Sequence, residues 1–325
     1  MIRILFAGSP DAARLTLEHL VNAQNEYGFE IAGVLSNPPS AKGRHKELIP
    51  TPVAQFASEK NIPVFTPEHL DAAAREAISP IGADLLVSFA YGHIFGPKFL
   101  ALFPLGGINL HPSLLPKYRG CTPVPAAILN RDEKTAVTVQ TLSLKMDEGD
   151  ILGQKIVDLN GTETTESLLN YSAEEGAKLI LEIIKKSAEA GKLPEGTPQS
   201  GEPSYTGIIT KEDGRINWNE SAEVIEAKIR AYYPEPGCWC IENGLPLRIL
   251  EAKLYPENAE SPAAAESESG TVLGTVLDFS KPIGILIKTG NGILAIRKLQ
   301  RQGKNAMDYK SFMNGARNFI GTVLE

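Results

Sequence analysis

Residues 2–23 read I-R-I-L-F-A-G-S-P-D-A-A-R-L-T-L-E-H-L-V-N-A, and this stretch decides the fold class. Ile2 to Ala7 is a short, mostly apolar run, which Gly8-Ser9-Pro10 ends with residues typical of a turn. From Asp11 to Ala23 the apolar residues recur at helical spacing. The stretch therefore predicts a strand, a loop and a helix in succession.

The same alternation continues through the first half of the chain. Strands are predicted at Glu30–Leu35, Ala83–Phe89, Gly107–Leu110 and Ala136–Leu142, and helices at Pro52–Lys60 and Glu166–Ala190. Repeated strand–helix units with apolar strands predict an α/β fold, a Rossmann-like parallel sheet covered by helices on both faces. Ligands of such sheets bind beyond the carboxyl ends of the strands.

The pattern changes after residue 190. Gly191 to Thr206 is rich in Gly, Pro and Ser, which is typical of a linker. A helix is then predicted at Ser221–Tyr232, and strands are predicted at Cys238–Glu242, Leu247–Leu254, Thr271–Leu277, Ile283–Lys288 and Gly292–Leu299. Asn243-Gly244 and Asn291-Gly292 are typical of hairpin turns between strands. Glu257–Gly270 is predicted to be a flexible loop. Short strands in this number predict a small OB-like β-barrel. We therefore expect domains at 1–190 and 207–325, joined by a linker at 191–206.

Length and composition limit the class of protein. At 325 residues the chain exceeds the usual size of one hydrophobic core, which favours two domains. No run approaches the roughly eighteen apolar residues of a membrane span, and the run Ile4–Ala7 is too short for a signal-peptide core. We expect a soluble, cytoplasmic protein with neither a membrane nor DNA as a partner. Cys121, Cys238 and Cys240 form no metal or disulfide framework, so reduced thiols are expected.

Charge is distributed unevenly. The net charge of −7 argues against a protein coated for nucleic acid. From residue 281 onward, however, the sequence contains eight basic residues and two acidic ones, which gives this segment a local charge of +6. The basic residues are Lys281, Lys288, Arg297, Lys298, Arg301, Lys304, Lys310 and Arg317. This segment is either a footprint for a polyanion or a solvated face.

The first loop bears on cofactors. A-G-S-P-D-A-A at residues 7–13 occupies the place of the G-x-G-x-x-G fingerprint of dinucleotide-binding proteins but holds one glycine. The chain also has no Walker pattern. NAD, FAD and ATP are therefore disfavoured.

Two polar residues end the strand predicted at 107–110. Asn109 and His111 project on the same face because side chains alternate along a strand, and Pro112 stops strand pairing after them. This position is the edge of the sheet where a ligand would bind. The spacing fits equally well two polar side chains that only hydrogen-bond within the protein at the end of a strand. The five histidines are widely spaced, which disfavours a histidine-rich metal site.

An acid is the expected third participant. L-K-M-D-E-G-D-I at Leu144–Ile151 follows the strand predicted at 136–142, and we place it on the ligand side of the sheet. A carboxylate there would orient His111 and stabilise its cation. Asp147 is one candidate, and Glu148 and Asp150 remain rivals.

Together these residues form longer motifs. N-x-H-P-S-L-L-P-x-x-R-G at Asn109–Gly120, M-D-E-G-D-I at Met146–Ile151 and A-Y-G-H-I-F at Ala90–Phe95 resemble the formyltransferase family that uses 10-formyltetrahydrofolate. Further motifs at Ser36–Val53 and Trp218–Gly237 extend the resemblance, over the whole chain, to the members that act on methionyl initiator tRNA. Three positions depart from the family pattern: Ala12, His45 with Glu47, and Cys121.

The resemblance implies a set of functional residues. Asn109, His111 and Asp147 would be catalytic, helping an amine to attack the formyl carbon directly and stabilising the oxyanion, with no metal. The folate donor would lie against Ser113, Leu114, Leu115 and Pro116 and against the backbone of His93, Ile94 and Phe95.

The family context also bears on three cations in a proline-flanked loop. Lys42, Arg44 and Lys46 are either a solvated loop or, with the basic terminal segment, contacts to the phosphates of the tRNA. Rival functions keep the folate domain but use an amino sugar or water as acceptor, or retain RNA binding without catalysis.

Overall fold

The structure of the protein is a computed structural model that describes residues 1–42, 47–256, 271–316 and 318–325, except for the side chain of Lys42. It divides into two compact units, each described here by itself. Unit 1 comprises Met1–Val124, Lys134–Asp158 and Ser167–Gly207, and unit 2 comprises Pro125–Glu133, Leu159–Glu166 and Ile208–Glu325. The domain boundaries given above stay predictions.

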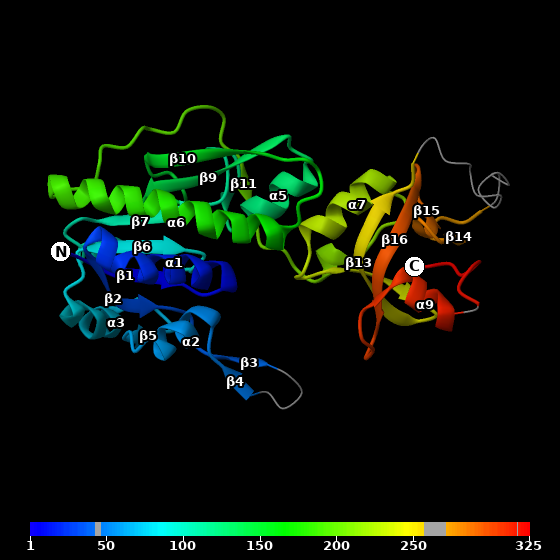
Figure 1. The fold of residues 1–325 in the computed structure, drawn as a ribbon, viewed down its shortest axis with the longest axis horizontal. Coiled ribbons are helices and arrows are strands. Elements are labelled where there is room, and N and C mark those ends of the chain that lie inside the picture. Colours follow the sequence, from blue (N-terminus) through cyan, green and yellow to red (C-terminus); the bar gives the residue numbers. More distant parts are fainter. Residues whose placement is uncertain (43–46, 257–270, 317) are drawn as a thin grey trace. The chain divides into compact units, whose positions relative to one another are not determined.

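The described part of unit 1 contains a seven-stranded sheet in the order β10-β9-β7-β6-β1-β2-β5 (Figure 1). Its strands are β1 (Ile2–Gly8), β2 (Phe29–Leu35), β5 (Val64–Phe65), β6 (Leu85–Phe89), β7 (Gly107–His111), β9 (Lys134–Thr141) and β10 (Ile151–Asp158). The strands from β5 to β7 pair in parallel, whereas β9 runs antiparallel to β7, and β10 to β9. The parallel α/β sheet is thus confirmed as far as β7 and corrected at its last two strands.

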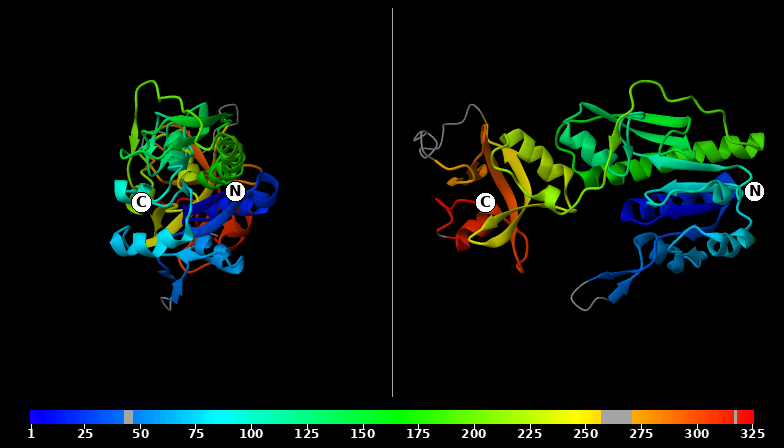
Figure 2. Two further views of the ribbon diagram at one scale, coloured as in Figure 1. Left: turned by 90° about the vertical axis from the view of Figure 1, so that its left-hand side faces the viewer. Right: turned by 180° about the vertical axis from the view of Figure 1, so that it is seen from behind.

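Helices cover both faces of this sheet, as predicted. They are α1 (Asp11–Tyr27), α2 (Pro52–Glu59), α3 (Ala72–Ile78) with η1 (Ser79–Ile81), α4 (Pro97–Leu100) and α6 (Thr165–Ala190), whereas α5 (Pro123–Leu129) lies mostly in unit 2. Buried residues of α1, α2 and α6 form one apolar cluster with β1, β6 and β7. A second cluster joins α3 and α4 to the opposite face. Figure 2 shows α1 and α6 alongside the strands from two further sides.

Packing explains the single glycine of the first loop. A Cβ atom on Gly8 would lie 2.7 Å from both the Ala13 Cβ atom and the Phe89 carbonyl oxygen. The glycine therefore lets the start of α1 approach the ends of β1 and β6 closely. Ala12, one of the departures from the family pattern, is buried there.

Short paired segments complete unit 1. β3 (Ser40–Lys42) pairs antiparallel with β4 (Glu47–Ile49), and β8 (Arg119–Gly120) pairs parallel with β11 (Tyr205–Thr206). The stretch predicted as a linker therefore carries structure, because β11 lies within it and adds a strand to β8.

Unit 2 is built on an antiparallel sheet, as predicted. Within the described residues its order is β12-β13-β16-β15-β14, with β17 paired to β16. Its elements are η2 (Glu212–Gly214), α7 (Ala222–Ala231), β12 (Cys238–Glu242), β13 (Leu245–Leu254), β14 (Val276–Ser280), β15 (Gly284–Lys288), β16 (Ile293–Arg301), β17 (Met307–Asp308) and α9 (Tyr309–Gly315). Asn243 and Gly244 form the predicted hairpin turn with φ of 50° and 78°.

One predicted strand of unit 2 is displaced. The prediction places a strand at Thr271–Leu277, but β14 begins at Val276. Gly274 has a φ of 84°, a left-handed conformation that a strand does not accommodate. The loop predicted at Glu257–Gly270 lies outside the described residues.

The last residues join both edges of the sheet in unit 2. Ile241 of β12 and Glu325 exchange two backbone hydrogen bonds of 2.7 and 3.0 Å. On the other side, the Val276 amide donates to the Thr322 carbonyl and the Leu324 amide to the Gly274 carbonyl. This segment closes the sheet on itself, which is the arrangement expected of a small barrel.

Among the helices of the described residues, none has the length and apolar character needed to cross a membrane.

Candidate active site

The site begins where β6 and β7 end side by side. The two strands pair in parallel with Ser88 opposite Asn109, so the loops that follow them start at the same edge of the sheet. Leu110 points into the apolar core and is 1% exposed. Its neighbours Asn109 and His111 therefore share the other face of the strand, as predicted from the alternation of side chains.

Asp147 meets both of these residues. Its Oδ1 atom lies 3.5 Å from the Asn109 amide nitrogen and 3.6 Å from His111 Nδ1. Two shorter bonds fix the carboxylate: Gln140 Nε2 donates to Oδ1 at 2.9 Å, and the Gly120 amide donates to Oδ2 at 2.8 Å. The structure thus brings the predicted amide, imidazole and carboxylate together from two separate segments.

The two rival acids lie elsewhere. Glu148 forms an ion pair with Arg119 at 3.0 Å and accepts a bond from the Tyr205 hydroxyl. Asp150 is exposed, and its backbone amide bonds to the Thr141 hydroxyl. Of the three acids, Asp147 is the one placed beside His111.

Asp147 reaches this position by a route that differs from the one predicted. We expected its turn to follow a parallel strand at the carboxyl edge, but β9 is antiparallel and pairs Asn109 with Gln140 and His111 with Thr138. β9 therefore ends beside the start of β7, and residues 142–150 must fold back to bring the carboxylate to Asn109.

The turn after β9 is conformationally demanding. Asp147 has a φ of 52°, the left-handed region that residues other than glycine seldom adopt. Two residues later, a Cβ atom on Gly149 would lie 1.7 Å from the Thr141 carbonyl oxygen. Such a turn persists where its surroundings hold it in place.

Both ring nitrogens of His111 face oxygen atoms. Nε2 lies 2.9 Å from the Tyr118 carbonyl oxygen, which can only accept, so Nε2 carries a hydrogen there. The distance of 3.6 Å from Nδ1 to Asp147 is too long for a hydrogen bond, so this contact is electrostatic. With its side chain 5% exposed, His111 is enclosed between a carbonyl and a carboxylate.

Three residues for which the sequence predicted no role in the site hold it together. Gln140 is 1% exposed and bonds to the Asp147 carboxylate. Gln199, from the predicted linker, donates to the Asp147 and Gly149 carbonyl oxygens at 2.7 and 2.9 Å. Arg119 contacts Gln199, Glu148 and the Tyr205 hydroxyl. Arg119 stands within a recognised motif, but no spacing in the sequence connects Gln199 to it.

Comparison with known proteins identifies the family of the chain. A model of the formyl transferase family matches residues 2–184, and a model of the formyl transferase C-terminal domain matches residues 208–317. A methionyl-tRNA formyltransferase of Treponema denticola is 44% identical over 328 residues, which cover 98% of each chain. The chain belongs to the methionyl-tRNA formyltransferase family. Members of this family are transferases, and the two family models correspond to the two sheets described above.

Solved structures share the fold of this family member. An N-formyltransferase from Helicobacter canadensis, in complex with folinic acid and dTDP-3-aminofucose, matches 91% of this chain and 99% of its own, with a TM-score of 0.62 and 20% identity. HypX from Aquifex aeolicus in complex with tetrahydrofolic acid matches 98% of this chain with a TM-score of 0.62 and 17% identity. The match spans 48% of HypX, so the likeness concerns about half of that longer protein.

The loop predicted to contact the donor follows β6 in this formyltransferase. His93 is exposed and bonds through Nε2 to the Asn37 side-chain oxygen at 2.9 Å, whereas Ile94 is 71% exposed and Phe95 is buried. Phe95 stacks on Tyr91, and burial raises the pKa of Tyr91 to about 12, so that its hydroxyl stays neutral. In the described part of the chain, the backbone groups of Ile94 and Phe95 have no recorded hydrogen bond.

The second predicted donor contact follows β7. Ser113, Leu115 and Pro116 are buried, and Leu114 is half-buried. The Ser113 hydroxyl is fully buried and donates to the Lys117 carbonyl at 2.7 Å. Its contribution is to shape the loop, which leaves Leu114 as the more accessible side chain of the four.

The predicted tRNA contacts of this family member are only partly within the described residues. The backbone of Lys42 forms the end of β3, whereas Arg44 and Lys46 lie outside the described residues, as does His45. Glu47, beside them in the sequence, begins β4.

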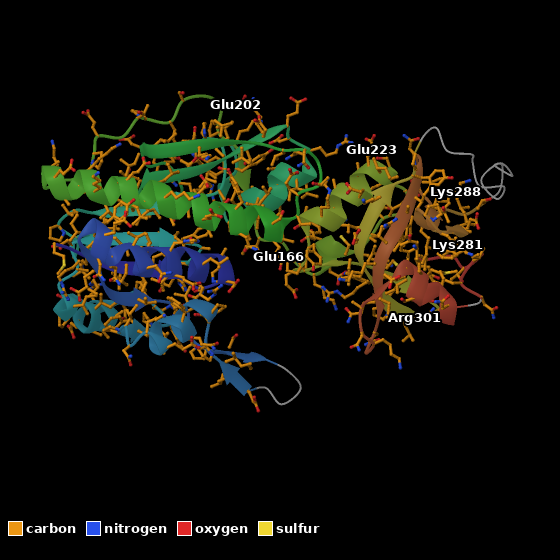
Figure 3. All side chains as sticks on the ribbon, viewed as in Figure 1. Glu166, Glu202, Glu223, Lys281, Lys288 and Arg301 are labelled. Atoms are coloured by element: carbon orange, nitrogen blue, oxygen red, sulfur yellow. The ribbon has the colours of Figure 1, made fainter. Side chains whose placement is uncertain are left out.

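The basic terminal segment separates into two groups. Arg297 lies over the Tyr309 ring at 4.7 Å, and Arg301 pairs with Glu242 and lies over the Phe312 ring at 4.5 Å. These arginines fasten α9 to β16. Four described lysines are exposed instead: Lys281, Lys298, Lys304 and Lys310. Figure 3 labels Lys281, which precedes β15, Lys288 at the end of β15, and Arg301 at the end of β16.

The cysteines of this formyltransferase are free thiols, as predicted. Cys238 and Cys240 point to the buried face of β12, and burial raises the pKa of the Cys238 thiol to about 12. Cys121 is exposed, and its thiol lies 3.0 Å from the Gly207 carbonyl. Among the described residues, no cluster of three or more His, Cys, Asp or Glu side chains is arranged to hold a metal ion.

Proposed function

We propose that this protein transfers the formyl group of 10-formyltetrahydrofolate to the α-amino group of methionyl initiator tRNA. The observation that carries the proposal is the convergence of Asn109, His111 and Asp147 at one edge of the sheet, in a chain related to methionyl-tRNA formyltransferases over 98% of its length. These are the groups that formyl transfer to an amine requires.

The donor would bind at the loops after β6 and β7. The Helicobacter and Aquifex proteins that share the fold hold folinic acid and tetrahydrofolic acid, respectively. The peptide groups of Ile94 and Phe95, which are unpaired within the described residues, would bond to the polar edge of a pterin ring, and the exposed side chain of Ile94 and the half-buried side chain of Leu114 offer apolar contact. The residues present therefore fit a folate.

The chemistry that we infer is direct attack by the acceptor amine. The nitrogen lone pair forms a bond to the formyl carbon, and the carbonyl electrons move onto oxygen. When this oxyanion collapses, the bond to the folate nitrogen breaks, and that nitrogen takes up a proton. The reaction needs oriented donors for the oxyanion and a base for the proton of the attacking amine, but no covalent intermediate with the enzyme.

Asn109 is suited to donate to the oxyanion. Its side chain is only partly buried, and its single recorded bond, to Asp147, is long at 3.5 Å. An amide hydrogen can therefore turn toward a substrate oxygen at little cost. One such donor typically contributes about 2.7–4 kcal/mol to transition-state stabilisation.

Asp147 and His111 would handle charge and protons. The Asp147 carboxylate is held by two short bonds and is 14% exposed, so it can accept a proton from the amine directly or through water. His111 in its cationic form stabilises that carboxylate. In that form both ring nitrogens carry hydrogens, so Nδ1, which makes no hydrogen bond at 3.6 Å from Asp147, can donate to the oxyanion while Nε2 keeps its bond to the Tyr118 carbonyl.

The tRNA would contact both basic regions. Phosphate contacts are assigned to the loop cations Lys42, Arg44 and Lys46 and to the exposed lysines of unit 2. Unit 2 also contains a cavity of about 750 Å³ that Lys211, Trp239 and Arg248 help to line. An aromatic ring flanked by cations suits RNA, because bases stack on the ring and phosphates pair with the charges.

A formylation assay with alternative acceptors tests this function. Purified protein is incubated with 10-formyltetrahydrofolate labelled in the formyl group and with charged initiator tRNA, a dTDP-linked amino sugar or buffer alone. We expect label to enter the methionyl-tRNA and neither the sugar nor free formate. Formylation of the sugar alone, release of formate in buffer, or tRNA binding without turnover would each support one of the rival functions instead.

A further inference from the structure

We propose that Gln199 is a positioning residue for this reaction, which fixes the turn that carries the Asp147 carboxylate. The inference rests on the proposed function, since it assumes that Asp147 acts in catalysis. Gln199 lies in the stretch that its composition marks as a linker, outside every motif recognised in the sequence.

The turn requires external support. Asp147 adopts a left-handed φ of 52°, and the turn folds back from the end of antiparallel β9. Two bonds of 2.9 Å between Thr141 and Asp150 close the turn at its base, but nearer the carboxylate the amide of Glu148 bonds to the Lys145 carbonyl at a long 3.4 Å. A contact from outside the turn can therefore fix the peptides that follow Asp147.

Gln199 contacts these peptides. Its Nε2 atom lies 2.7 Å from the Asp147 carbonyl oxygen and 2.9 Å from the Gly149 carbonyl oxygen. The same nitrogen lies 3.1 Å from the side-chain oxygen of Gln140, whose amide nitrogen donates to the Asp147 carboxylate. One amide group thus touches the backbone of the turn and the residue that orients its carboxylate.

Arg119 determines which way the Gln199 amide points. Its Nε and Nη2 atoms donate to Gln199 Oε1 at 3.1 and 2.7 Å. A guanidinium can only donate, so the oxygen of the amide must face Arg119 and the NH₂ group must face the turn. Arg119 is 8% exposed and also pairs with Glu148, so it is itself fixed.

This arrangement defines a positioning role rather than a catalytic one. All hydrogen-bonding groups of the Gln199 side chain are used within the protein, and none reaches the Asp147 carboxylate atoms. Gln199 would affect the reaction only through the placement of Asp147. Its loss should therefore lower kcat and leave KM for both substrates nearly unchanged.

Two substitutions separate the contacts of Gln199. Gln199→Ala removes all of them, whereas Gln199→Glu keeps an acceptor for Arg119 but sets a carboxylate against the carbonyl oxygens of the turn. We expect both variants to lose about 10- to 100-fold in kcat, because small displacements of a catalytic group have effects of this size. Gln55→Ala is the matched control, since Gln55 is exposed on α2 and its side chain bonds to Glu59 of the same helix, far from the turn in the sequence.

A double-mutant cycle tests whether Gln199 acts through Asp147. In an Asp147→Ala background, Gln199→Ala should reduce kcat by less than about twofold, because the group that it positions is gone. Thermal unfolding of every variant shows whether the fold is retained, and Gln199→Glu remains informative if Gln199→Ala is unstable.

The outcomes distinguish this inference from the proposed function. Independent, additive losses of kcat from Gln199→Ala and Asp147→Ala would overturn this inference. Wild-type kcat in Gln199→Glu would also overturn it, because catalysis would then depend only on the pairing of residue 199 with Arg119. A silent Gln199→Ala beside an impaired Asp147→Ala would overturn it while leaving the proposed function intact. Wild-type kcat in Asp147→Ala would overturn the assigned role of Asp147 and this inference together.

Discussion

The turn that carries Asp147 can be displaced with one methyl group. Gly149→Ala would place a Cβ atom 1.7 Å from the Thr141 carbonyl oxygen, 2.7 Å from the carbonyl carbon and 2.8 Å from the hydroxyl oxygen. Real Cβ atoms do not come closer than 3.0 Å to such neighbours, so the turn must move by at least 1.3 Å, the difference between 3.0 and 1.7 Å. The obstacle is mainly backbone, which cannot rotate away as a side chain can.

This displacement should slow the catalytic step. A misplacement of about 1 Å can cost 10²-fold in rate, which corresponds to about 2.7 kcal/mol of transition-state stabilisation. We therefore expect Gly149→Ala to lower kcat by about 10²-fold or more. KM for the folate should change little, because the donor loops after β6 and β7 do not include this turn.

The measurement is the initial rate of methionyl-tRNA formylation, with thermal unfolding monitored in parallel. Gly153→Ala is the matched control, because Gly153 lies in strand β10, which follows the same turn. Its Cβ atom would lie 3.4 Å from the Leu179 side chain, which is an ordinary contact. Overpacking should destabilise Gly149→Ala by about 1–3 kcal/mol, so rates are compared well below its unfolding temperature. If kcat of Gly149→Ala stayed within twofold of wild type, the placement of the turn would not limit catalysis.

Three further predictions follow from the site and the surface. His111→Ala and Asp147→Ala should each lower kcat by about 10²–10³-fold with thermal unfolding close to wild type, as measured by single-turnover formylation; retained turnover would exclude the residue concerned. Arg44→Ala should raise KM for charged tRNA but not for folate, and should reduce the salt slope of tRNA binding by about one; an unchanged slope would contradict a phosphate contact. Iodoacetamide at pH 8 should label Cys121 alone in the folded protein, because Cys238 and Cys240 are buried and burial raises the pKa of both thiols, so that they stay neutral. A second label detected by mass spectrometry would contradict this.

The strands that the sequence predicts best are those whose signal is local. β1, β6 and β12 are apolar or alternating runs bounded by turn residues, and they were found to within two residues. The direction of β9 was missed because alternation along a strand does not depend on which way its neighbour runs. β10 was missed altogether, since as an edge strand it is largely solvent-accessible and lacks an apolar run.

The site residues divide along the same line. Asn109 and His111 could be paired from sequence because the period of a strand places them on one face. The sequence could not distinguish Asp147 from Glu148 and Asp150, because the position of Asp147 depends on a turn that folds back over several residues. Gln199 lies 52 residues from Asp147, and no periodicity links two segments at that separation.

The antiparallel direction of β9 also explains why a supposed linker is needed at the site. In a parallel strand the chain would emerge at the carboxyl edge, and a carboxylate there would need only a short loop. Because β9 ends beside the start of β7, the chain must instead return over the sheet in a turn with a left-handed residue at its centre. Gln140 of β9 bonds to the Asp147 carboxylate, but the contacts to the carbonyl oxygens of Asp147 and Gly149 come from elsewhere. They come from β11 and the residues before it, where pairing with β8 anchors the segment that holds Gln199 against the turn.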